Sequence, residues 1–178
     1  MSVDSVRLRP WRAEDAVAIA AMTGDEHLRR WSSMGDDVAA WIASQRAEVR
    51  GPSRAICLAD DDRALGKVAL RMPGFASPAT TCAAIRPSDA PVGELSYWLL
   101  LEARGRGLAR PAVEAAMRSI VADTGLRSVV LDIELTNAAS LRVAERLGAE
   151  RREPDRVQLD RTGTPRRLVV FVLPVSSY

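Results

Sequence analysis

The chain has few of the residues that build metal or nucleophilic sites. It contains two cysteines, Cys57 and Cys82, and a single histidine, His27. The cysteines lie far apart and follow no Cys-x-x-Cys spacing, so with one histidine they supply no zinc ligand set. We therefore expect no metal, and reduced cysteines as the default.

Long apolar runs and a strong charge imbalance are also missing. No apolar run approaches membrane-spanning length, and residues 1–11 contain no signal-peptide core. The net charge of +2 gives no reason to expect nucleic acid as a partner. We expect a cytoplasmic protein that neither enters a membrane nor binds nucleic acid. With 178 residues, 47% of them hydrophobic, we expect one domain over residues 1–178.

Lysine is almost absent. Of the 25 basic residues only Lys67 is lysine, and the others are arginine. The planar fork of arginine suits phosphate oxygens, so this composition is compatible with a phosphate-bearing ligand.

Residue periodicity predicts an alternation of strands and helices. Asp36 and Asp37 precede an apolar stripe and predict a helix start there. In the first half we expect a strand at 6–10, helices at 13–22 and 38–49, and strands at 55–59 and 64–70. In the second half we expect a long irregular loop at 72–92, a buried strand from Gly93, helices at 111–125 and 138–147, a strand at 128–135 and a closing pair of strands around 162–165. Residues 23–35 give no clear signal. The order predicts a mixed sheet covered by helices.

A glycine-rich segment between the buried strand and the next helix carries the most information. It comprises Arg104, Gly105, Arg106, Gly107, Leu108, Ala109 and Arg110. Glycines let the main chain approach a ligand, and the first turn of a helix offers unpaired N–H groups that bind diphosphate. A Walker loop needs lysine after the second glycine, and a dinucleotide fingerprint needs a third glycine at position 110; both patterns fail. The plainer alternative is a tight connection without a ligand.

The segment from Gly93 to Ala149 resembles a known family. Arg104-Gly-Arg-Gly107-Leu-Ala109 is similar to the coenzyme A loop of GNAT N-acetyltransferases, Q/R-x-x-G-x-G/A. The runs GELSYWLLLEARGRGLA and ERLGA, the start of a helix at Asn137, and VRLRPWRAEDA near the beginning resemble the RimJ/RimL-like branch, which acetylates ribosomal-protein N-termini. The resemblance implies a GNAT fold of the α/β (α+β) class: a mixed, mostly antiparallel seven-stranded sheet flanked by about four helices.

The resemblance also implies which residues bind acetyl-CoA, the expected cosubstrate. Tyr97, Trp98 and Leu99 take the place of the strand that binds the pantetheine arm, with a main-chain N–H near Trp98 or Leu99 facing the thioester oxygen. Residues 104–110 would hold the diphosphate, and Asn137 would contact the coenzyme arm. The plainer alternatives are core packing for the three strand residues and a helix cap for Asn137.

Two catalytic groups follow from the same resemblance. The tyrosine that protonates the thiolate in many family members is replaced by Ala144, and Ser140 is the candidate acid of this branch, unless it only completes the helix cap. Glu94 is the candidate base, because partial burial could bring a carboxylate near the acceptor amine, and Glu134 is the reserve. The alternative for Glu94 is a solvated strand end.

Two functions of different classes remain at this point. One is acetyl transfer in a ternary complex to a primary amine, either a peptide N-terminus or a small molecule, by a protein that forms a homodimer as this branch often does. The other is a non-catalytic module that binds acyl-CoA. Free-thiol release over a panel of amines distinguishes them.

Overall fold

The strands of the chain join in one seven-stranded sheet with the order β1-β2-β3-β4-β5-β7-β6. The computed structural model describes residues 6–31, 37–75 and 77–178. The strands are β1 (Val6–Arg9), β2 (Ser53–Leu58), β3 (Gly66–Arg71), β4 (Val92–Leu99), β5 (Ser128–Glu134), β6 (Glu150–Leu159) and β7 (Pro165–Pro174). All neighbours pair antiparallel except β4 and β5, which run parallel. The predicted mixed, mostly antiparallel seven-stranded sheet is confirmed.

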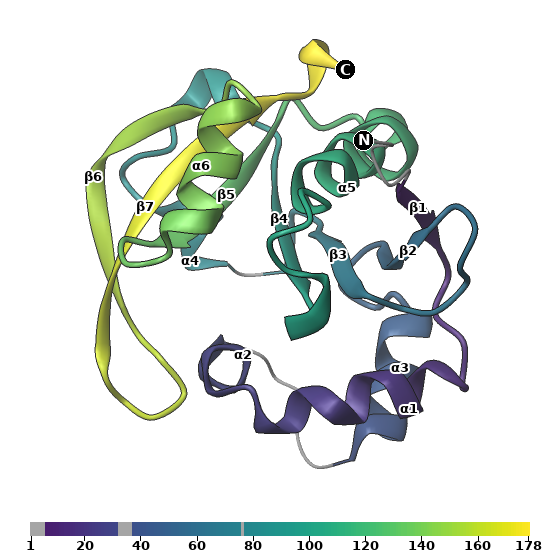
Figure 1. Cartoon of the computed structure of the whole chain (residues 1–178). Coiled ribbons are helices and arrows are strands. Elements are labelled where there is room, and N and C mark those ends of the chain that lie inside the picture. The colour runs from purple at the N-terminus through teal and green to yellow at the C-terminus, as the bar shows by residue number, and fades with distance from the viewer. Residues whose placement is uncertain (1–5, 32–36, 76) are drawn as a thin grey trace.

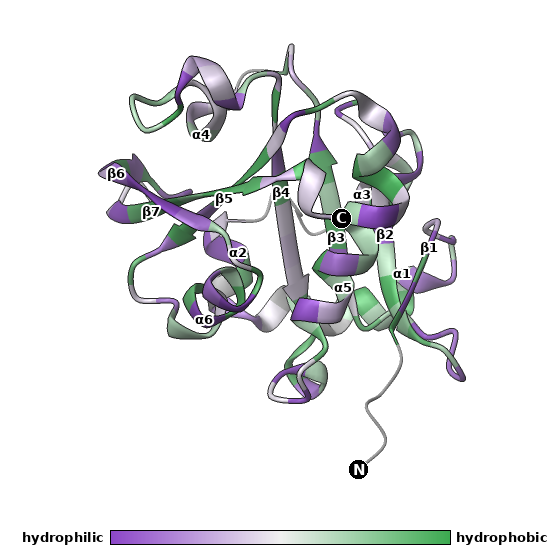
Figure 2. Ribbon diagram, turned by 90° about the horizontal axis from the view of Figure 1, so that it is seen from above, coloured by the Kyte–Doolittle hydropathy of each residue, from purple (hydrophilic) through white to green (hydrophobic). Residues whose placement is uncertain are grey.

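The sheet is most apolar at its centre. In β5 only Asp132 is not fully buried, and in β7 the residues from Leu168 to Leu173 are all buried. Such continuous burial requires cover on both faces of a strand. The edge strand β6 is largely polar, and Figure 2 shows it in purple beside the greener β7 and β5.

Helices cover both faces of the sheet (Figure 1). The described helices are α1 (Asp15–Ala20), α2 (Glu26–Trp31), α3 (Val38–Arg46), α4 (Pro78–Thr81), α5 (Ala109–Ala116) and α6 (Ala138–Arg146). Neighbouring residues of β4 point to opposite faces. Trp98 contacts Trp41 of α3, whereas Tyr97 lies near Ser140 of α6. The face that carries Trp98 is called the Trp98 face below.

The described residues hold six α-helices, where the sequence predicts about four. The additional ones are α2, which lies in the segment without a clear signal, and α4, which lies in the expected irregular loop. Both are short, and helices of this length depend on tertiary contacts rather than on local propensity. Asp37 caps α3 as predicted, with its carboxylate accepting from the Ala40 N–H at 2.8 Å. Asp36 lies outside the described residues.

The central feature of the sheet is a split between β4 and β5. The two strands pair only at Val92–Ser128, Gly93–Val129 and Glu94–Val130. Beyond Glu94 each strand continues without the other, and Figure 1 shows them diverging. This split leaves main-chain groups of both strands without a strand partner in the middle of the sheet, where they are available to a ligand.

Two further findings concern the residues that the structure describes. None of their helices is both long and apolar enough to cross a bilayer. Cys57 and Cys82 are free thiols, and no group of three or more His, Cys, Asp or Glu side chains within the described ranges is arranged to hold a metal ion.

Candidate functional site

The main chain of β4 presents alternate residues to the split. The Leu70 N–H donates to the Pro52 carbonyl, so the main-chain groups of Leu70 face β2. The main-chain groups of its neighbours in alternation, Ala69 and Lys67, therefore face β4. At the far end the Leu100 N–H donates to Leu65 O at 2.8 Å, again toward β3. By alternation, the peptide groups of Trp98 face β3 and those of Tyr97 and Leu99 face the split. Of the two predicted oxyanion donors, Leu99 is therefore the one whose N–H is directed into the gap.

The glycine segment leads from this strand to α5 and leaves its N–H groups available. Gly105 and Gly107 have left-handed backbone conformations, with φ of +75° and +78°. The helix begins after Leu108 without a side-chain cap, and Pro111 lies in its first turn. Within the described part of the chain, no acceptor receives the N–H of Gly105, Gly107, Leu108, Ala109 or Arg110. A concave row of main-chain donors at a helix start is a site for a diphosphate.

A Cβ placed on Gly107 would meet no atom within 4 Å. The glycine is thus not needed to avoid a protein neighbour. It is needed for its backbone conformation, and the space beside it remains open.

Arg104 is already committed to contacts within the protein. Its Nε donates to Leu99 O at 3.0 Å, its guanidinium pairs with Asp25, and its N–H donates to Leu101 O at 3.2 Å. These bonds connect the end of β4 to the start of α2. The Arg104 side chain, predicted to help bind the coenzyme, therefore instead fixes the position of the glycine segment that follows β4.

Helix α2 is held from the other side of the split as well. Arg30 lies 3.7 Å from both Glu134 of β5 and Asp160 at the end of β6, and the Trp31 Nε1–H donates to Glu134 at 3.0 Å. The Arg161 N–H donates to the Arg30 carbonyl at 3.2 Å. Because Asp25 is tied to the β4 side, α2 bridges the two diverging strands. The position of α2 is therefore set by contacts to both sides of the split.

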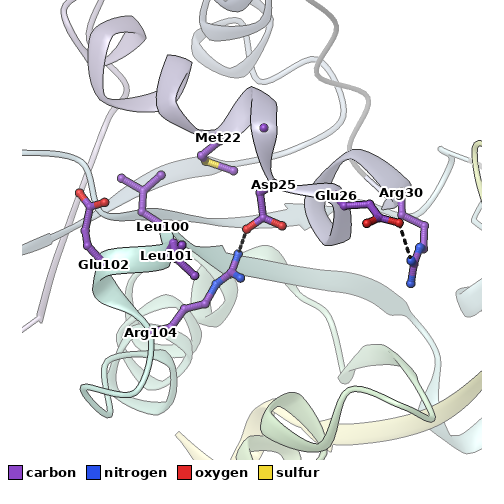
Figure 3. Close-up of a pocket in the computed structure, with 9 residues that line it drawn as sticks. Met22, Asp25, Glu26, Arg30, Leu100, Leu101, Glu102 and Arg104 are labelled. Atoms are coloured by element: carbon purple, nitrogen blue, oxygen red, sulfur yellow. Dashed lines mark hydrogen bonds and ion pairs between the residues drawn. The ribbon is translucent and has the colours of Figure 1, made fainter.

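A cavity of about 490 Å³ lies beside this bridge (Figure 3). Its lining combines Met22 with the start of α2 and the segment that follows β4, namely Gly24, Asp25, Glu26, Arg30, Leu100, Leu101, Glu102 and Arg104. In Figure 3 the Asp25–Arg104 pair crosses the cavity, with Leu100 and Leu101 on one side and Glu26 and Arg30 on the other. The cavity gives access from solvent to the end of β4.

Glu94, the predicted base, is half-buried and has two partners. It accepts a hydrogen bond from Ser77, which precedes α4, and forms an ion pair with Arg71 at 3.3 Å. It is therefore not a solvated strand end. Its carboxylate instead joins α4 and β3 to the last paired position of the split.

Glu134, the reserve base, is buried and locked as an anion. Burial alone would raise its pKa, but hydrogen bonds from Trp31 and Thr136 and the charges of Arg30 and Arg166 outweigh it and lower the pKa. A carboxylate with a lowered pKa is a poor proton acceptor. The geometry thus assigns Glu134 to holding α2.

The carboxylate that sequence reasoning missed is Asp132. It lies on β5 two residues beyond the last pair with β4, on the Trp98 face. Its Oδ2 accepts from Arg156 at 2.8 Å, whereas its Oδ1 is buried with no hydrogen-bond partner in the described residues. Burial raises the pKa of Asp132, hydrogen bonding and charge from Arg156 oppose the rise, and Glu94 adds to it. The available signal was a charged residue inside an otherwise apolar buried strand.

The opposite face of the split holds two hydroxyls. The Tyr97 hydroxyl is buried and makes no hydrogen bond of good geometry in the described residues. Burial raises the pKa of Tyr97, and the nearby Ser140 hydroxyl partly offsets the rise. Asn137 caps α6, because its Oδ1 accepts from the Ser140 N–H at 3.1 Å. The structure therefore brings Tyr97, Asn137 and Ser140 together beside the split.

Known proteins match this chain at the level of family and fold. A family model described as the acetyltransferase (GNAT) domain matches residues 5–150. A search of curated proteins found no match. Among solved structures, the acetyltransferase YncA from Salmonella typhimurium with acetyl-CoA is 18% identical, with a TM-score of 0.71 over 98% of this chain and 96% of that one.

Two further solved structures are similar over nearly the whole chain. RimJ from Mycobacterium smegmatis, in complex with CoA-disulfide, is 19% identical with a TM-score of 0.70, over 97% of this chain and 83% of that one. A chimera of the spermidine N-acetyltransferase SpeG from Vibrio cholerae with hSSAT is 14% identical with a TM-score of 0.71, over 98% of each chain. At these identities the structures establish a shared fold.

Proposed function

Because the chain belongs to the GNAT acetyltransferase family, we propose that it transfers an acetyl group from acetyl-CoA directly to a primary amine in a ternary complex. The acceptor is a peptide N-terminus or a small molecule. The observation that carries the proposal is the juxtaposition of the open N–H row at 105–110 with the unpaired edge of β4. A diphosphate fits the first and an extended amide arm fits the second.

The main-chain groups around the split suit acetyl-CoA. The N–H groups of Gly105, Gly107, Leu108, Ala109 and Arg110 would hold the diphosphate, helped by the positive end of α5. The peptide group of Tyr97 would pair with the pantetheine arm as a strand pairs with its neighbour, which leaves the Leu99 N–H for the thioester end.

Bound acetyl-CoA supplies a thioester carbonyl that an amine can attack and a sulfur that can leave as a thiolate. Asp132 takes the proton from the acceptor ammonium at its free Oδ1, which makes the amine nucleophilic. The Leu99 N–H, directed into the split, stabilises negative charge on the carbonyl oxygen. This replaces Glu94 by Asp132 as the proposed base, because Asp132 has a buried oxygen without a partner in the described residues and burial raises its pKa.

The C–S bond breaks as the amide forms, and the proton for the leaving thiolate comes from the hydroxyl pair on the opposite face. The attacking nitrogen loses its second proton in the same step, and this proton restores the hydroxyl pair. Ser140 remains the proposed donor, and Tyr97 is its neighbour and proton source. Since Ala144 provides no hydroxyl, Tyr97 of β4 is the tyrosine that we propose for this role. Asn137 holds Ser140 through its cap and contacts the coenzyme arm.

Several finer features belong to the same proposal. We assign the chain to the RimJ/RimL-like branch on the motifs at 93–109 and 137–149. We also propose that residues 1–178 form one domain and that the protein is a homodimer. Light scattering of the purified chain tests the oligomeric state independently of activity.

The decisive experiment measures free thiol released from acetyl-CoA in the presence of a panel of amines. Turnover with any amine, with initial rates dependent on both substrates, supports direct transfer. Binding of acetyl-CoA without thiol release from any amine would assign the chain to the non-catalytic class. Competition by ATP or NAD with coenzyme A would instead favour a nucleotide-binding enzyme that uses the same glycine segment.

A further inference from the structure

The only lysine of the chain lies next to the proposed acyl-transfer site. Lys67 is on β3, directly opposite Trp98 in the pairing with β4, and is partly buried. Its Nζ lies 5.5 Å from the centre of the Trp41 ring. Trp41 and Trp98 pack together at 6.0 Å and, with Trp11, form an aromatic wall on the Trp98 face. In a chain that otherwise uses arginine, a lysine within this wall needs an explanation.

Lys67 has no carboxylate partner within the described residues. No ion pair or hydrogen bond joins its ammonium to an acidic side chain, and its contact is the face of Trp41. Burial lowers the pKa of Lys67 to about 8, with further lowering by the charges of Arg71 and Arg50, and Glu94 opposes this only in part. Glu94 is also already shared between Arg71 and Ser77. The neighbourhood therefore has excess positive charge in a place that water reaches poorly.

The same neighbourhood opens onto the split. Ser96 lies in the middle of β4 on the Trp98 face and is exposed, although β5 on one side of it is almost entirely buried. Ala69 is its partner on β3, one pair away from Lys67–Trp98. On the other side Asp132 follows the last paired position of β5. The exposed Ser96 thus lies between two groups without a charged partner among the described residues. One is the Lys67 ammonium on β3, and the other is the Asp132 Oδ1 on β5.

We propose that Lys67 anchors an anionic group of the acceptor, so that the natural substrate is a primary amine that also carries a carboxylate or a comparable anion. The inference rests on the proposed function and names its substrate class. The acceptor lies over Ser96, with its amine toward Asp132 and its anion toward Lys67. A partly buried cation without a partner is costly, and a substrate anion removes that cost only when it is bound.

A structural role alone explains the arrangement less well. The stem of a lysine can fill apolar space while its ammonium reaches water. However, an apolar side chain would pack within the tryptophan wall without the desolvation that lowers the pKa of Lys67. A lysine in this desolvated position is better explained by an anionic ligand that pairs with its ammonium.

The test compares acceptors in matched pairs that differ by one carboxylate. L-leucine is paired with 3-methylbutylamine and 4-aminobutyrate with propylamine, and kcat/KM is measured by thiol release. We expect the wild type to favour the carboxylated member of at least one pair by about tenfold or more, the worth of one charge-assisted contact. Lys67→Gln should abolish the preference and Lys67→Arg should keep most of it, with melting temperatures confirming that both variants fold.

A second measurement does not depend on turnover. Because Lys67 is the only lysine, trinitrobenzenesulfonate labels one side chain, and peptide mapping separates that product from the labelled α-amine. The probes here lack a primary amine, because an amine would itself consume the reagent. We expect 4-methylpentanoate and butyrate to protect Lys67 and their neutral primary amides not to protect it.

The outcomes separate this inference from the proposed function. Thiol release with equal kcat/KM within every pair, or a preference unchanged in Lys67→Gln, overturns the anion anchor and leaves the transferase intact. Absence of thiol release with every amine overturns the proposed function, and the protection experiment then decides whether Lys67 still binds anions. Acetylation of Lys67 itself by acetyl-CoA would make it an acceptor and would also overturn its role as an anchor.

Discussion

The two strands that flank the split contribute in different ways to the site. In the proposed site the β4 side contributes mainly main chain: the peptide groups of Tyr97 and Leu99, and the N–H groups at the start of α5, which begins without a side-chain cap. The Tyr97 hydroxyl is its one side-chain contribution. On the β5 side the contribution is side chain: Asp132 on the strand and Ser140 on α6, whose first turn is capped by Asn137. The two helices that follow these parallel strands therefore differ at their first turns: α5 has no side-chain cap, whereas α6 is capped by Asn137.

This difference separates two tasks. Main-chain N–H groups are fixed by the backbone and suit a ligand group that never changes, such as a diphosphate. Side chains can be exchanged without changing the backbone, so the chemistry of proton transfer and acceptor choice is more open to substitution. The comparison predicts that changes on the β4 side affect coenzyme binding, whereas changes on the β5 side affect rate.

The largest effect is expected on the β5 side. Asp132→Asn keeps the shape of the side chain and removes its charge, and we expect kcat to fall by about 10² to 10⁴, the usual worth of a general base. Burial raises the pKa of Asp132, and the groups that face it are Arg156 and Glu94. Since a base works only when ionised, the wild-type rate should fall as pH drops through that raised pKa. Thiol release measured across acid and alkaline pH should show this acid limb in the wild type only.

A matched control for this change is Glu134→Gln on the same strand. Its lowered pKa and its bonds to Trp31 and Arg30 indicate a role in holding α2. A carboxyl with a lowered pKa stabilises the fold above its ordinary pKa, and this contribution is lost as pH falls through the folded value. Glu134→Gln should therefore lower stability near neutral pH and keep the acid limb of the rate. An acid limb that disappears in Glu134→Gln instead of Asp132→Asn would reverse the assignment of the base.

The next largest effect is expected on the β4 side. Gly107→Val forces a β-branched residue into a left-handed conformation at φ +78° and directs its side chain into the open space beside the N–H row. We expect the Kd for coenzyme A to rise at least about tenfold, or about 1.4 kcal/mol, as measured by titration calorimetry. Gly125→Val is the control, because that glycine, beyond the other end of α5, has φ +72° and equally open space. Equal losses of affinity in both variants would indicate strain alone and contradict the diphosphate site.

Local signals explain what the sequence could predict. Alternation and helical spacing depend on near neighbours, so all seven strands, the Asp37 cap and the glycine segment were predicted. Helix α2 was not predicted, because its position depends on Arg104, Glu134 and Asp160, which come from three distant parts of the chain. These contacts leave no trace in the periodicity of residues 23–35.

The base illustrates the same limit at a single residue. Glu94 and Asp132 are both acidic residues in buried strands, and nothing local distinguishes them. Only the packing of α4 and β3 engages Glu94, through Ser77 and Arg71, and only the end of the β4–β5 pairing leaves an oxygen of Asp132 free. The sequence thus indicated an acidic residue in a buried strand as a candidate base, but it did not indicate which strand or which contacts the carboxylate makes.

A smaller effect on rate should follow from the hydroxyl pair. Ser140→Ala and Tyr97→Phe each remove one hydroxyl, and we expect kcat to fall about fivefold, the worth of one hydrogen bond. The effect is modest because a thiolate is a good leaving group and needs little help from an acid. If the two hydroxyls share one proton, as their proximity indicates, the double variant should be no slower than the slower single one. Multiplied losses would show that the two act independently.

The smallest effect tests the capped helix itself. Asn137→Ala removes the acceptor of the Ser140 N–H and should lower the free energy of unfolding by about 1 kcal/mol. Asn137→Asp keeps that acceptor and should retain the stability, while it loses the amide donor that we propose for the coenzyme arm. Chemical denaturation and coenzyme titration of both variants therefore separate the two roles. A loss of coenzyme affinity in Asn137→Ala alone would make the residue a cap that acts by holding Ser140, and the β5 side would then contribute nothing to coenzyme binding directly.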